Sequence, residues 1–73
     1  MRLNLRDGVR HRLAANLKRL RKERGWSQDS LADSAHPDRT YVSGIEWVVR
    51  NPTVTVIERV ATALKCSLGD LLD

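Results

Sequence analysis

The chain has few of the residues that form disulfides or metal sites in small proteins. Its 73 residues include one cysteine, two histidines and no phenylalanine. A lone cysteine, Cys66, cannot form an intrachain disulfide, which suits a reducing compartment, and we interpret it as a small core residue. The other usual metal ligands, His11 and His36, lack the short paired spacing of a zinc site, and we expect them at the surface. The sequence therefore predicts no disulfide, no metal and no cofactor.

Long apolar runs are also absent. No segment reaches the length of a signal-peptide core or a membrane span. We therefore expect a cytoplasmic protein with no membrane partner. Residues 1–73 make one domain, and a domain of this size buries only about 60% of the surface that its unfolded chain exposes. Disulfides and metals are excluded as sources of additional stability. A partner subunit is the remaining way to stabilise so small a core, and the sequence therefore predicts a homodimer.

Acidic residues are scarce in the first third of the chain. Residues 1–24 contain nine basic and two acidic side chains and carry a net charge of +7, whereas the remainder carries −3. With a pI of about 10.0, this asymmetry favours a polyanionic partner, nucleic acid before membrane. A charge-rich, solvated first helix is the alternative explanation.

Apolar residues recur at three- and four-residue steps throughout, which predicts five short helices and no strands. A residue suited to cap a helix N-terminus precedes each of them: Asp7, Ser27, Asp38, Thr53 and Ser67. Gly25 would end the first helix and Pro37 the second, while the third would continue to Val49 and stop before Pro52. Residues 1–6 form either a flexible arm or an extension of the first helix.

The second and third helices, at about residues 27–49, match a helix-turn-helix, with an ordinary helical hairpin as the alternative. The side of the third helix that faces away from its core residues is polar, small and nearly uncharged. It carries Arg39, Thr40, Ser43, Gly44 and Trp47. A merely solvated face would more often carry Glu, Lys and Gln. Gly44 costs roughly 1 kcal/mol in a helix interior, which indicates a close approach to bases or to another helix.

The residue types on this face fit contacts with DNA bases. Arg39, in the first turn, could donate two hydrogen bonds to a guanine. Thr40 and Ser43 could contact bases or phosphates. Tyr41 could donate its hydroxyl to a phosphate, or it could pack at the rim of the turn.

Two flanking segments could hold the DNA backbone. Ser27 and Gln28, with the first backbone amides of the second helix, would form a phosphate clamp at a positive helix end. Arg50 and Asn51, after the third helix, could hold the backbone from the other side. Each pair could instead be solvated.

Four stretches, "GWSQDSLADSA", "DRTYVSGIE", "RNPTVTVIERVATAL" and "SLGDLL", resemble the lambda-repressor-like (Cro/CI, XRE) helix-turn-helix family. The resemblance extends roughly from Leu13 to Leu72. The block "DRTYVSGIE" followed by "RN" is most like the controller proteins of type II restriction-modification systems.

This resemblance implies a compact all-α domain of five helices. It implies a transcriptional regulator that dimerises through its C-terminal helices and binds double-stranded DNA at a pseudo-palindromic operator, with RNA polymerase as a candidate further partner. By position, Gln28 matches the family's phosphate-contacting glutamine. The recognition-helix contacts match Arg39, Thr40, Tyr41 and Ser43, and the loop that holds the DNA backbone matches Arg50 and Asn51.

The resemblance also implies a buried ion pair between Arg21 and Glu46, which would orient the third helix; the alternative is a Glu46 solvated at a helix end. For the dimer interface we expect the last two helices, with Val56 and Leu72 as candidate contacts.

The chain departs from the family pattern at three places. His36-Pro37 replaces the usual turn glycine and the aliphatic residue after it. Trp47-Val48-Val49 replaces a polar, glycine-containing stretch, so Trp47 could meet sugar-phosphate or a protein, or could cover the core. Lys65 stands where the family often has glycine.

Other functions on the same scaffold are a phage-type repressor and an antitoxin or coactivator-type module that binds a protein. We do not expect an enzyme. The sequence shows no cysteine-histidine, serine-histidine-acid or paired-carboxylate arrangement, and no phosphate-binding glycine loop.

Overall fold

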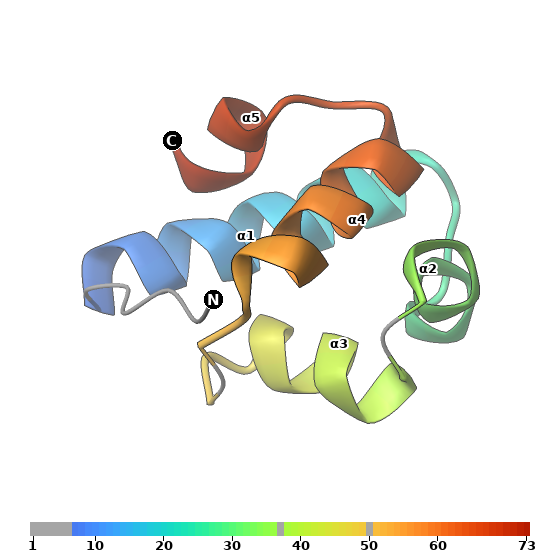
Figure 1. The fold of residues 1–73 in the computed structure, drawn as a ribbon, viewed down its shortest axis with the longest axis horizontal. Coiled ribbons are helices and arrows are strands. Elements are labelled where there is room, and N and C mark those ends of the chain that lie inside the picture. The colour runs from blue at the N-terminus through green and yellow to red at the C-terminus, as the bar shows by residue number, and fades with distance from the viewer. Residues whose placement is uncertain (1–6, 37, 50) are drawn as a thin grey trace.

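The computed structural model describes residues 7–36, 38–49 and 51–73, although not the side chain of Asp7. Over this range the chain forms five helices and no strand (Figure 1). They are α1 (Asp7–Glu23), α2 (Gln28–Ala35), α3 (Arg39–Glu46), α4 (Val54–Leu64) and α5 (Leu68–Leu72). The predicted five-helix fold is therefore confirmed. The predictions for residues 1–6, and for Asp7 as a cap, lie outside the described part of the molecule.

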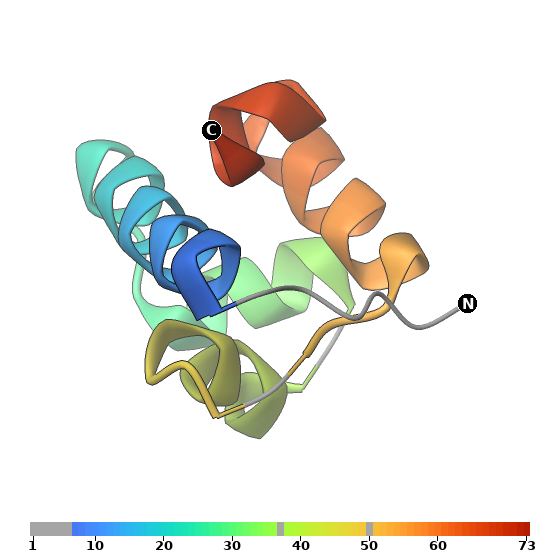
Figure 2. The same ribbon diagram turned by 90° about the vertical axis from the view of Figure 1, so that its left-hand side faces the viewer.

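All five helices contribute to a single core. α1 packs against α3 and α5, and α2 packs against α3 and α4. The largest buried apolar side chains of the core are Leu13, Leu17, Leu20, Leu31, Val42, Ile45, Ile57, Val60, Leu64 and Leu71. In Figures 1 and 2, α3 lies along one edge of the molecule, with no other described helix beyond it. One side of α3 is therefore left open.

The helices begin where the capping residues predict. The side chains of Ser27, Asp38, Thr53 and Ser67 each accept a hydrogen bond from the backbone N–H three residues later. At Ser67 the cap is reciprocal, because the Asp70 carboxylate accepts the Ser67 N–H. Each cap satisfies one of the backbone donors that a helix N-terminus leaves free. These four start predictions are confirmed.

The first four described helices are each followed by a left-handed residue, and one of these four residues is glycine. Gly25 (φ 70°) follows α1, His36 (φ 70°) follows α2, Val48 (φ 60°) follows α3 and Lys65 (φ 55°) follows α4. After α1, the Trp26 N–H donates to the carbonyl of Arg21 at 3.0 Å. This is the hydrogen bond of a Schellman motif, and α3 and α4 end with the same pattern.

The predicted end of the third helix is wrong. α3 stops at Glu46, and the Val49 side chain is 71% exposed instead of buried. The reason is the left-handed Val48, which turns the chain away from the helix axis, so that the Val49 N–H bonds the Gly44 carbonyl at 2.9 Å. Within the part of the chain that the structure describes, no helix has the length and apolar character needed to cross a membrane.

The helix ends generate a matched pair of stability predictions. Glycine adopts a left-handed conformation without the steric cost that other residues incur, about 1 kcal/mol or more. Lys65→Gly should therefore raise the free energy of unfolding by about 1 kcal/mol. Gly25→Ala should lower it by about as much, because an added Cβ would meet no atom within 4 Å and only the backbone conformation would matter. Equilibrium urea unfolding measures both, and unchanged midpoints in both variants would contradict the assignment.

Candidate nucleic-acid interface

The open side of α3 carries most of the residues that the sequence predicts there. Arg39 and Thr40 are exposed, Ser43 is half-buried and Trp47, directly after the helix, is 74% exposed. The opposite side packs into the core through Val42, Ile45 and Glu46. The polar residues are therefore presented to solvent from a helix whose other side is fixed.

Gly44 is predicted on this open side as the point of a close approach. It is buried. The chain folds back after the early end of α3, and the Val49 N–H bonds the Gly44 carbonyl. The burial of Gly44 agrees with the alternative of a close approach within the protein.

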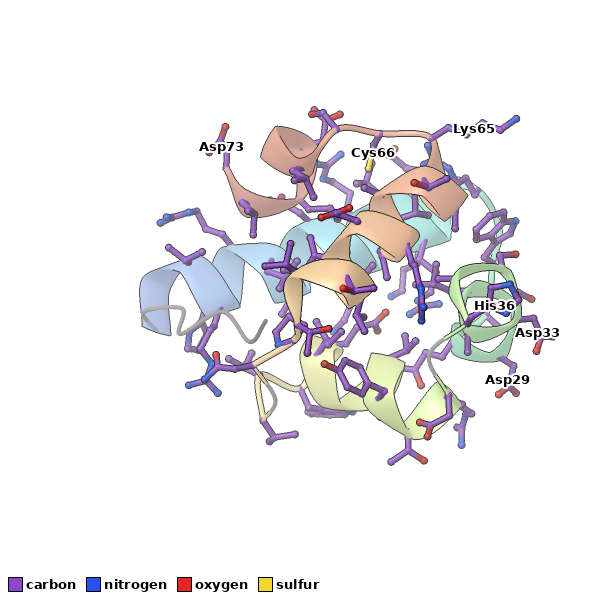
Figure 3. All side chains as sticks on the ribbon, viewed as in Figure 1. Asp29, Asp33, His36, Lys65, Cys66 and Asp73 are labelled. Carbon is purple, nitrogen blue, oxygen red and sulfur yellow. The ribbon has the colours of Figure 1, made fainter. Side chains whose placement is uncertain are left out.

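Arg39 faces an acidic partner across the turn. Its Nε lies 3.4 Å from Oδ1 of Asp29, and both side chains are well exposed, at 66% and 72%. Figure 3 shows Asp29 on α2, on the side of that helix where α3 begins. The guanidinium is thus held in solvent between the two helices. The sequence does not predict this contact, because the two residues are ten positions apart and lie on either side of a turn.

The start of α2 combines an exposed cap with an anchored glutamine. Ser27 Oγ accepts the Ser30 N–H at 3.0 Å. Gln28 is half-buried, and its Nε2 donates to Oε1 of Glu46 at 3.1 Å. The side chain of Gln28 is therefore tied to α3, and the first backbone amides of α2 point outward at its positive end.

The Arg21–Glu46 ion pair is present and buried. Nε of Arg21 donates to Oε2 of Glu46 at 2.7 Å, and Nη2 donates to Oε1 at 3.0 Å. The two side chains are only 11% and 2% exposed. Hydrogen bonding to Glu46 raises the pKa of Arg21 above its ordinary value. Nη1 of Arg21 also donates to the carbonyl of Trp26 at 2.8 Å. The pair therefore joins α1, the turn before α2 and the end of α3.

The loop after α3 is fastened to the helix by Tyr41. This half-buried residue accepts the backbone N–H of Thr53 on its hydroxyl oxygen at 3.1 Å. Its contact with the loop agrees with the alternative in which Tyr41 packs beside the turn. Asn51 is half-buried, and its Oδ1 is buried with no hydrogen-bond partner among the described residues. Arg50 lies outside the described part of the chain.

The remaining chemistry-bearing side chains do not gather into a site. His11 and His36 are exposed, and Cys66 is half-buried against the core, where burial raises the pKa of its thiol. Among the residues whose positions are described, no three His, Cys, Asp or Glu side chains lie together as metal ligands would. In Figure 3, Cys66 lies between α4 and α5, on the opposite side of the fold from α3.

The fold recurs in known regulators. Residues 17–71 match the model of the helix-turn-helix family HTH_3. The chain belongs to this family. It is 42% identical over 60 residues to a hypothetical transcription factor of Neisseria meningitidis, which covers 82% of this chain but 57% of that protein. It therefore spans little more than half of that relative.

Two further relatives are similar to this chain over nearly their whole length. Control protein C.MunI of Mycoplasma is 38% identical over 66 residues, which make up 89% of each chain. The crystal structure of the restriction-modification controller protein C.AhdI from Aeromonas hydrophila superimposes with a TM-score of 0.83 at 34% identity, covering 88% of this chain and 97% of that one.

The buried ion pair generates a stability prediction. Glu46→Leu would leave the Arg21 guanidinium buried without its counter-charge, which should cost about 3–5 kcal/mol of folding free energy. The double variant Arg21→Met with Glu46→Leu removes both charges and should recover most of that loss. Urea unfolding followed by circular dichroism measures each variant. A single variant no less stable than the double one would show that the pair is not an isolated, charge-compensated unit.

Proposed function

We propose that this protein is a sequence-specific double-stranded DNA-binding transcriptional regulator. The observation that carries the proposal is the open side of α3. It presents Arg39, Thr40 and Ser43 to solvent on a helix that is fixed from behind by a buried ion pair. A helix with these polar groups fits the major groove, whose base edges offer a distinct pattern of donors and acceptors.

Each of these residues has a proposed role. Arg39 forms hydrogen bonds with the edge of a base. Guanine is the base whose two acceptors match the two donors of the guanidinium. Thr40 and Ser43 contact bases or nearby phosphates. Ser27, Gln28 and the first amides of α2 hold one backbone strand. Tyr41, with Arg50 and Asn51 in the loop, holds the other.

We further propose that the protein is a restriction-modification controller acting as a dimer. The similarity to C.MunI and C.AhdI over nearly their full lengths supports this assignment. A two-fold dimer would bind a pseudo-palindromic operator with half-sites ~34 Å apart, one turn of the double helix. RNA polymerase is a further partner that such a regulator would meet at a promoter.

Apolar residues on α4 and α5 support the dimer. Leu68 is 40% exposed, and Val56 and Leu72 are half-buried at the margin of the core. α4 and α5 pack against each other. A second copy of the chain would cover these side chains and enlarge a core that is small for a chain of this size.

The base-reading role of Arg39 is tested by selection of bound duplexes from a random pool. Arg39→Ala should relax the preference at one position of each half-site and cost about 1–3 kcal/mol of discrimination there. The matched control is Arg59→Ala, which removes the same charge from an exposed position on α4. Base preferences identical in the wild type and Arg39→Ala would refute base reading by Arg39.

The dimer interface is tested by a substitution that should separate the two protomers without unfolding them. Val56 is the third residue of α4, and its N–H bonds the Thr53 cap. A glutamate in the first turn of a helix is favoured by the helix dipole, so Val56→Glu should leave the helix intact while placing a charge in the interface. Sedimentation at micromolar concentration should show a dimer for the wild type and a monomer for this variant. Thr55→Glu, exposed on the same turn, should remain a dimer.

A further inference from the structure

A shallow groove of about 410 Å³ lies between α1 and the end of α3. Its α3 side consists of Glu46 and Val48. Its α1 side is a stripe of residues at helical spacing: His11, Ala14, Ala15, Lys18, Arg19 and Lys22. Trp47 stands at its edge, with its ring centre 6.0 Å from Nζ of Lys18. We call this surface the Trp47 groove.

The turn that carries Trp47 is fixed to α1. Nη2 of Arg10 donates to the carbonyl of Val48 at 2.6 Å. Val48 itself is a β-branched residue in a left-handed conformation, where glycine is favoured. The structure thus holds Trp47, which is 74% exposed, beside α1, and Val49, which is 71% exposed, lies in the turn that follows.

The groove is basic. Lys18 and Lys22 are exposed and have no acidic partner within the described ranges. Arg19, in contrast, forms an ion pair with Glu23 at 3.2 Å. Among the described residues that line the groove, Glu46 is the one carboxylate, and it is already neutralised by Arg21. A surface with uncompensated lysines and an exposed aromatic ring complements a polyanion that also has apolar parts.

The groove continues the open side of α3. Arg39, Ser43 and Trp47 are four residues apart and follow one side of the helix in successive turns. A DNA duplex seated against Arg39 and Ser43 therefore passes Trp47 next, and the lysines of α1 lie beyond that ring.

The geometry points to the Trp47 groove as an additional binding site for the DNA sugar-phosphate backbone. Trp47 and Val49 pack against deoxyribose, while Lys18 and Lys22 neutralise phosphates. This inference rests on the proposed function and adds to it a contact made by α1, outside the helix-turn-helix. Because phosphates carry no sequence information, the contact adds affinity without base preference.

The test compares the salt dependence of binding between variants. Lys18→Gln with Lys22→Gln keeps the aliphatic stems and removes two charges. Fluorescence anisotropy against salt should show that the slope of log Kobs falls in magnitude by about 1.8 if both lysines contact phosphates. The loss should be equal on a selected operator and on a scrambled duplex. The control, Arg59→Gln with Lys65→Gln, removes two exposed charges from α4 and the turn after it and should leave the slope unchanged.

Two outcomes would overturn the inference. If the Lys18/Lys22 variant has the same salt slope of log Kobs as the wild type, the groove does not contact DNA. The groove could then bind an acidic protein instead. A loss confined to the operator would show an effect on base reading instead of a phosphate contact. If the wild type fails to prefer the operator, the proposed function fails, yet slopes on the scrambled duplex still decide whether the groove binds DNA.

Trp47 gives a second, independent measurement. The chain has two tryptophans, and the other, Trp26, is half-buried against the core. Duplex should protect the wild-type fluorescence from acrylamide quenching, and the protection should fall in Trp47→Phe, which retains Trp26. Equal protection in both proteins would place Trp47 away from the DNA.

Discussion

The buried ion pair between Arg21 and Glu46 fixes the orientation of α3 relative to the rest of the protein. Its two side chains come from the end of α1 and the end of α3, and it is extended to α2 by Gln28 and to the preceding turn by the Trp26 carbonyl. Burying the two charges contributes little net stability. The buried pair is, however, compatible with very few relative orientations of the two side chains. These buried contacts position α3. Its open side is therefore not needed to hold the helix in place.

The sequence predicted the elements that depend on local chemistry. The caps Ser27, Asp38, Thr53 and Ser67 were identified correctly because each satisfies backbone donors a few residues away. The course of α3 after Glu46 was not predicted, because the residue that adopts the left-handed turn is Val48, a residue type that does not indicate such a turn. The burial of Gly44 was not predicted either.

Contacts across the turn lie beyond what spacing can predict. Asp29 and Arg39 are separated by an αL residue and a proline, and only the angle between α2 and α3 brings their side chains to 3.4 Å. The Trp47 groove has the same origin, because the basic charge of α1 predicts a polyanionic partner but does not show which of its residues lie beside α3. Local structure was therefore predictable, whereas surfaces shared by two helices were not.

The Asp29–Arg39 pair bears on how the proposed site would discriminate. An exposed ion pair contributes about 0–1 kcal/mol, while a correctly placed guanine offers the Arg39 fork about 1–3 kcal/mol of discrimination against other bases. Exchange of Asp29 for guanine is therefore favourable, and exchange for a mismatched base is close to neutral. In the proposed site, the ion pair with Asp29 would therefore set a threshold that a guanine exceeds and a mismatched base does not.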